Sequence, residues 1–246
     1  MGKHTNKATI AGLVIALGII YGDIGTSPLY VFNAIISGRA ITEDLIVGSL
    51  SCIIWTITLQ TTIKYVVLVL QADNKGEGGI FALYALVRRR RKWLVLPAMI
   101  GGAALLADGM ITPPITITSA IEGLQKVPAF HNLSQYIIYI VIFILSAFFF
   151  LQQFGTASIG KFFGPVMALW FSMLAVLGIW HVFDDLSIFR AFNPWYAIRL
   201  LSVNPGALWI LGAVFLCTTG AEALYSDLGH CGRENIRISW IFVKTC

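Results

Sequence analysis

Long apolar runs separated by short polar segments make up most of the chain. A helix that crosses a bilayer needs about 20 apolar residues, within a range of roughly 17–25. Six runs meet this requirement, at residues 10–36, 45–70, 94–121, 136–152, 162–182 and 207–228. The first run is too long for the apolar core of a signal peptide, so it is predicted to be a retained span. The pattern predicts an all-α fold, a polytopic membrane helix bundle.

Composition agrees with a membrane protein and excludes other classes. Hydrophobic residues make up 57% of the chain and charged residues 12%, whereas soluble domains carry about 25% charged residues. The mean hydropathy is +0.80. The net charge of +5 comes from basic residues in loops, so no nucleic-acid partner is expected. The four cysteines and four histidines show no metal-ligand spacing, and we expect neither a cofactor nor an enzyme.

Basic residues predict the orientation. With the N-terminus inside, twelve of them fall in inside segments, namely Lys3, Lys7, Lys75, Arg88, Arg89, Arg90, Arg91, Lys92, Lys161, Arg233, Arg237 and Lys244. Four fall in outside loops, namely Arg39, Lys126, Arg190 and Arg199. This asymmetry predicts a multi-pass plasma-membrane protein with a cytoplasmic N-terminus. The cluster Arg88 to Lys92 is also suited to anionic lipid, and Lys64, within the second span, is expected to snorkel to the interface.

The first span carries a carboxylate and helix-breaking residues at the same place. Asp23 lies in the sequence YGDIGTSPLY, with Gly22, Gly25 and Pro28 close by. A charge at that depth costs about 2.5–3.5 kcal/mol on insertion scales, so it marks a functional site by default. Pro28 has no N–H for the carbonyl four residues earlier, which leaves that oxygen unpaired. Many transporters form ion sites at such broken helices.

Two further acids lie well inside predicted spans, again beside hydroxyl groups. Asp108, Thr112 and Thr116 repeat every four residues in the third span and share one helical face. Thr219 precedes Glu222 by three residues in the sixth span. Carboxylate, hydroxyl and carbonyl oxygens can replace the water shell of a monovalent cation. Carboxylates in a low dielectric can also carry protons, so these residues predict cation binding coupled to proton movement.

Other interpretations of these residues stay open. A carboxylate within a span can be a structural hydrogen-bond partner, and threonine can bond its own helix backbone. A proton-coupled amino-acid or polyamine carrier is the second candidate, although carboxylates favour a cation. An aspartyl protease using Asp23 and Asp108 is disfavoured because no Gly-x-Gly-Asp signature is present. A potassium channel is disfavoured because the filter sequence Thr-Val-Gly-Tyr-Gly is absent.

Several motifs follow one another along nearly the whole chain. They are Tyr21–Tyr30 (YGDIGTSPLY), Ala72–Gly79 (ADNKGEGG), Ile111–Pro113 (ITP), Ser119–Gly123 (SAIEG), Gly155–Ala157 (GTA), Gly220–Tyr225 (GAEALY) and Asp227–His230 (DLGH). With these motifs the chain resembles the potassium uptake permease family of Kup/HAK/KT type. The resemblance implies potassium uptake by proton symport on the LeuT/APC-type inverted-repeat fold, with helices 1 and 6 broken. It leaves open a homodimer of the full-length protein.

The resemblance also implies roles for individual residues. It implies a potassium site made by Asp23, Tyr30, Thr112, Thr116, Thr219 and Glu222. It implies proton coupling through Asp23, Asp108 and Glu222, and helix breaks at Gly22, Gly25, Pro28 and Gly220. Potassium ions and protons would then be the transported species, with no cofactor.

The resemblance covers only part of such a transporter. Family members continue through further spans, so residues 1–246 would form the N-terminal part of the membrane domain, with the C-terminal half absent. Residues Phe242 to Cys246 depart from the family pattern, and Pro114-Ile115-Thr116 stands where members commonly have alanine, isoleucine and serine. A truncated fragment of the transporter is therefore expected, with a non-functional or regulatory product as the alternative.

Overall fold

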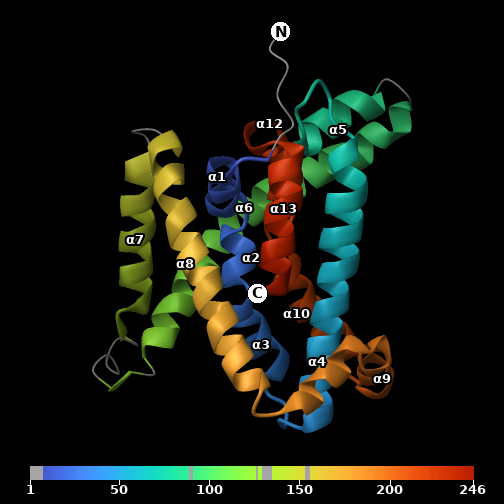
Figure 1. The fold of residues 1–246 in the computed structure, drawn as a ribbon, viewed down its shortest axis with the longest axis vertical. Helices are drawn as coiled ribbons and strands as arrows, with labels where there is room; N and C mark the ends of the chain where they lie inside the picture. Colours follow the sequence, from blue (N-terminus) through green and yellow to red (C-terminus); the bar gives the residue numbers. More distant parts are fainter. Residues whose placement is uncertain (1–7, 89–90, 126, 129–134, 153–155) are drawn as a thin grey trace.

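The chain folds into an elongated bundle of helices (Figure 1). A computed structural model describes residues 8–88, 91–125, 127–128, 135–152 and 156–246. Within these residues all regular elements are helices, apart from one isolated bridge between Asn74 and Glu77. The all-α class predicted from the sequence is confirmed. The helices α5 and α12 lie at one end of the bundle and α9 lies at the other, and we call these the α5 end and the α9 end (Figure 1).

The described residues form a series of helices and short helical turns. In chain order they are α1 (Ile10–Ile20), α2 (Gly22–Thr26), α3 (Pro28–Ile36), α4 (Glu43–Thr56), η1 (Ile57–Leu68), η2 (Val69–Gln71), α5 (Gly79–Arg88), η3 (Lys92–Leu94), α6 (Val95–Leu124), α7 (Ile137–Gln152), α8 (Thr156–Val182), η5 (Leu186–Phe192), α9 (Pro194–Val203), α10 (Ala207–Phe215), η6 (Leu216–Thr218), α11 (Ala223–Ser226), α12 (Leu228–Cys231) and α13 (Arg233–Thr245). The η1 helix has π geometry, and the other η helices are 3₁₀ turns.

Four continuous helical stretches are long and apolar enough to cross a membrane. They are Glu43–Gln71, Lys92–Leu124, Phe162–Val182 and Ala207–Ser226. Shorter apolar helices include Ile10–Ile20 and Ile137–Leu151. Large apolar side chains also stay exposed over much of the surface, as Ile138, Phe143 and Phe149 do on α7. These features indicate a membrane helix bundle, because lipid tails or further helices can cover such a surface and water cannot do so without cost. The number of spans, six, stays a prediction.

Local sequence explains where several helices begin. Thr42 precedes α4, and its hydroxyl accepts a hydrogen bond from the Leu45 N–H at 3.2 Å. Asn193 precedes α9, and its side chain accepts from the Trp195 N–H at 3.0 Å, with Pro194 at the first helical position. Such caps satisfy backbone donors that have no partner within the helix.

The buried side chains form two separate cores. The first contains residues of α1, η1, α8 and α11 to α13, and it lies toward the α5 end. The second contains residues of α3, α4, α9 and α10, and it lies toward the α9 end. Within the first core α1 packs most extensively against α8. A Cβ on Gly164 would lie 2.5 Å from the Val14 carbonyl oxygen, so this glycine lets the two backbones approach closely.

The helix α13 packs against the residue that follows α1. Tyr21 is fully buried, its hydroxyl donates to the Ile236 carbonyl at 2.9 Å, and it lies 3.0 Å from the Ser239 hydroxyl. Its ring stacks on Trp240 with centroids 6.1 Å apart. The C-terminal end of α13 lies near the middle of the bundle's height (Figure 1). Lys244, which we assigned to an inside segment, is therefore on the last turn of a helix that runs back into the bundle.

We predict that Tyr21→Phe lowers the free energy of unfolding by about 1 kcal/mol. The substitution keeps the stacked ring and removes the buried hydroxyl that donates to the Ile236 carbonyl and lies beside the Ser239 hydroxyl. Thermal unfolding in detergent measures the effect. Tyr139→Phe removes the same hydroxyl from an exposed position on α7 and serves as the control. Equal melting temperatures for the two variants would contradict the assigned role of this hydrogen bond.

Candidate functional site

The first predicted span is interrupted at the residues around Asp23. The helix α1 ends at Ile20, Tyr21 leaves helical geometry with φ −98° and ψ 11°, and α3 starts at Pro28. Between them Gly22 opens the short helix α2. The run 10–36 is therefore three short helices rather than one rod.

Hydroxyl groups and an indole bind the backbone of this interruption. The Ser27 hydroxyl donates to the Asp23 carbonyl at 2.7 Å, and the Thr26 hydroxyl lies 3.2 Å from the same oxygen. The Trp170 indole N–H, from α8, donates to the Gly25 carbonyl at 2.9 Å. A side chain on Gly25 would collide with Phe171, since its Cβ would lie 2.8 Å from that ring. Several carbonyl groups of the break are thus already hydrogen-bonded.

A second interruption separates α10 from α11. The turn η6 ends at Thr218, Thr219 is extended with φ −58° and ψ 135°, and helix resumes at Ala223. Gly220 has φ +84°, a left-handed conformation that costs a side-chain-bearing residue roughly 1–2 kcal/mol. Glycine is the residue that adopts it without this cost.

The two interruptions lie in contact. A Cβ on Gly220 would lie 2.6 Å from the Asp23 Cβ and 3.5 Å from its Oδ2 atom. The Tyr30 hydroxyl lies 3.1 Å from the Ser27 hydroxyl and also interacts with the Thr219 side chain. The structure therefore brings Asp23, Tyr30 and Thr219 together, although they are far apart in the sequence. The Asp23 side chain stays exposed within this chain.

The helix α6 adds polar groups to this region. The Thr112 hydroxyl donates to the Asp108 carboxylate at 3.0 Å, and Thr112 is buried. The buried Thr116 hydroxyl has no hydrogen-bond partner among the described residues. Asp108 interacts electrostatically with both Asp23 and Glu222. The three acids therefore form one electrostatic cluster.

A cavity of about 450 Å³ lies between η1, α5, α6, η6 and α11. Its polar wall includes Lys64, Tyr65, Asp108, Thr218, Thr219 and Glu222. Asp23, Tyr30, Thr112 and Thr116 do not line it, so the potassium site implied by the resemblance is not gathered in one cavity here. Among the described residues, no group of three or more His, Cys, Asp or Glu side chains is placed to hold a metal ion.

Lys64 and Tyr65 are wall residues that our sequence reasoning did not assign to a site. We expected Lys64 to snorkel to the interface, and the structure places it on the same cavity as Asp108 and Glu222. The sequence signal that could have found it is a charge within a predicted span, as for the three acids. Which neighbours Lys64 faces also depends on the π geometry of η1, and no sequence pattern indicated that geometry.

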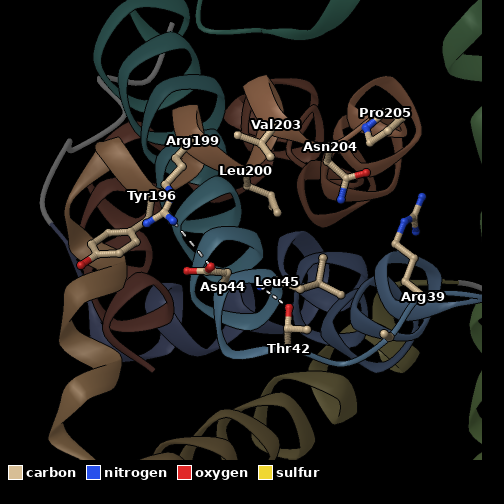
Figure 2. Close-up of a pocket in the computed structure, with 11 residues that line it drawn as sticks. Arg39, Thr42, Asp44, Leu45, Tyr196, Arg199, Leu200, Val203, Asn204 and Pro205 are labelled. Atoms are coloured by element: carbon tan, nitrogen blue, oxygen red, sulfur yellow. Dashed lines mark hydrogen bonds and ion pairs between the residues drawn. The ribbon is translucent and has the colours of Figure 1, made fainter.

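A different cavity, of about 460 Å³, lies at the α9 end between α4 and α9 (Figure 2). Arg39 and Arg199 are among the residues that line it, and Arg199 lies 3.8 Å from the Asp44 carboxylate. Two guanidinium groups against one carboxylate make this cavity net positive. It is therefore not a place where a cation would collect.

The fold and these contacts define a helical membrane protein with polar groups gathered at two helix interruptions. Residues 10–246 match the family described as K+ potassium transporter integral membrane domain, and the chain belongs to this family. The family resemblance seen in the sequence motifs is confirmed. No solved structure matches the chain.

Three relatives show the extent of the similarity. The chain is 60% identical over 249 residues to the probable potassium transport system protein Kup of Flavobacterium johnsoniae, which covers 99% of this chain and 37% of the relative. It is 62% identical over 247 residues to the protein of the same description from Cytophaga hutchinsonii, and the match covers 97% of this chain and 36% of that relative. It is 56% identical over 254 residues to the probable potassium transport system protein Kup 1 of Lactococcus lactis, and the match covers 99% of this chain and 38% of that relative. The chain thus spans somewhat more than a third of the length of these relatives.

We predict that Gly220→Ala destabilises the protein by about 2 kcal/mol or more, because strain at positive φ adds to the clash with Asp23. Thermal unfolding in detergent measures the loss. Gly212→Ala on α10 is the matched control, because a Cβ there meets open space and alanine favours a helix. A melting temperature of the Gly220 variant at or above that of the control would refute the close contact of the two interruptions.

Proposed function

We propose that this protein takes up potassium ions across the cell membrane by symport with protons. The observation that carries the proposal is the contact between the two interruptions, where Asp23 lies against Gly220. Relatives whose names describe potassium transport support the choice of ion. On this proposal the chain supplies part of a LeuT/APC-type inverted-repeat transporter, in which helices 1 and 6 are the broken ones.

The chemistry of the residues agrees with a hard monovalent cation. Carboxylate and hydroxyl oxygens can replace the hydration shell of such an ion without the geometry that a small divalent ion demands. In the proposal Asp23 and Glu222 supply charge, and hydroxyl groups complete the shell. These hydroxyl groups belong to Tyr30, Thr112, Thr116 and Thr219.

The electrostatic cluster of three acids offers a physical route for coupling. Asp23, Asp108 and Glu222 repel one another when all are ionised, because like charges raise each other's energy in a low dielectric. Binding of potassium ions and protons relieves this repulsion. The Thr112 hydroxyl donates a hydrogen bond to the Asp108 carboxylate. In the proposal the proton is carried within this group of three acids, Asp23, Asp108 and Glu222.

Charges at the two ends favour a cytoplasmic α5 end in a multi-pass plasma-membrane protein. Arg88, Lys92 and Arg233 lie near α5 and α12, whereas Arg39 and Arg199 lie at the α9 end. Positive charge stays on the cytoplasmic side. The lipid-binding cluster from Arg88 to Lys92 stays a proposal, and its members Arg89 and Arg90 lie outside the described residues.

The remainder of the proposed transporter would cover surfaces that this chain leaves open. The long helix that contains α6 has an apolar stretch with no residue buried in this chain. It nevertheless carries Asp108 and the prolines Pro113 and Pro114. Further helices in the longer relatives provide a reason for that exposure. A homodimer of the complete protein would also cover part of such an exposed apolar surface.

We predict that Asp23→Asn lowers rubidium uptake, a tracer for potassium, by roughly a hundredfold or more, because an oxygen-ligand charge is lost from the site. The gene is expressed in full in a bacterial strain that lacks its own potassium uptake. In parallel, the chain replaces the matching segment of the Flavobacterium johnsoniae relative. Both formats measure tracer uptake against equal amounts of membrane protein.

Asp184→Asn is the control for this experiment, because Asp184 lies in the loop between α8 and η5 and its exposed side chain pairs with the exposed His181. Wild-type flux in the Asp23 variant would remove Asp23 from the site. Absence of uptake in the unchanged chimera would count against the proposed function itself.

We predict that excess potassium abolishes rubidium uptake, whereas amino acids and polyamines at the same concentration leave it within about twofold of its value. An oxygen-lined cation site has no partner for the carboxylate of an amino acid. Uptake assays with competing solutes measure this. Competition by amino acids or polyamines would favour a carrier for those solutes in place of potassium.

A further inference from the structure

The cavity beside Glu222 contains one positive side chain. Of the described residues that line it, the charged ones are Lys64, Asp108 and Glu222. An ammonium group beside a proposed cation route needs an explanation, because it repels the ion that the carboxylates attract. It also carries the same charge as that ion.

The backbone around Lys64 is firmly held. Thr61 is almost fully buried, and the Trp240 indole N–H from α13 donates to the Thr62 hydroxyl at 3.1 Å. The Lys64 carbonyl accepts the Val69 N–H five residues later, the bond of a π-helix. Segments of π-helix are rare and often lie at functional sites. These contacts hold the backbone from which the exposed Lys64 side chain reaches the cavity.

The ammonium group itself is not paired with an acid. Among the described residues no carboxylate lies within 4.0 Å of the Lys64 Nζ atom. Nζ instead lies 4.9 Å from the centroid of the Tyr65 ring. Lysine carries its charge on a flexible four-carbon stem, so the group can leave the ring and reach other parts of the cavity.

We propose that Lys64 is a tethered cation that takes the place of potassium beside Glu222 and Asp108 when the ion leaves toward the α5 end. This inference rests on the proposed potassium uptake. Ion release leaves neighbouring carboxylates without a compensating charge, which is costly. An ammonium group that moves in offsets that cost and speeds release. The same group weakens potassium binding, and a transporter needs its ion to bind weakly enough to leave.

Lys64 is thus a positioning residue whose charge sets a balance between affinity and turnover. Lys64→Met removes the charge and keeps the length of the stem. We expect the KM for rubidium to fall about tenfold, and the maximal rate to fall about tenfold as well, because a competing cation is gone. Lys64→Arg keeps the charge, so its KM is expected to stay within about threefold of the unchanged protein.

The test measures rubidium uptake against concentration in the gene product expressed in full and in the chimera with the Flavobacterium johnsoniae relative. Lys64→Gln is a second neutral variant, in case the methionine variant does not fold. Lys75→Met is the control, because it removes a lysine charge from an exposed loop that does not line this cavity. A merely structural lysine would lower the maximal rate and leave KM unchanged.

Lower KM together with a lower rate in both neutral variants, with arginine near the unchanged protein, supports the proposal. An unchanged or higher KM in the neutral variants overturns it, and so does an arginine variant that behaves like methionine. If the unchanged protein and chimera take up no rubidium, the proposed function fails, which is distinguishable from failure of the lysine inference.

Discussion

Close contact between two helix interruptions is the constraint on which the rest of the site depends. Gly220 has no side chain, and this absence lets the backbone of the second interruption lie against Asp23. The same residue has a positive φ, and the Thr219 side chain just before it interacts with Tyr30. Two segments nearly two hundred residues apart therefore meet at one small residue.

Much of the fold could be predicted because apolar run length is a strong signal in membrane proteins. The predicted run 45–70 corresponds to the helical stretch Glu43–Gln71, and the run 136–152 to α7. The exact form of the first span could not be predicted in the same way. Proline and glycine indicated a break near Asp23, but the division into α1, α2 and α3 depends on contacts from α8 and α13.

The candidate site could only partly be predicted from the sequence. The spacing of Asp108 and Thr112 predicted one face, and the hydrogen bond between them follows from that spacing. The approach of Gly220 to Asp23 has no local signal, because it is a contact between distant segments. Lys64 was missed for a related reason: a π-helix changes which side chains face a neighbour, and apolar periodicity assumes the α-helical repeat.

The two hydrophobic cores lie on opposite sides of the two interruptions. Each interrupted segment has one part in the core at the α5 end and the other part in the core at the α9 end. A continuous helix would connect the two cores rigidly, so that they would move together. An interrupted one has no continuous backbone hydrogen-bond ladder between the two cores, and Asp23 lies against Gly220 where the two interruptions meet. Tilting one core against the other would therefore displace the ends of the bundle far more than the residues at its centre.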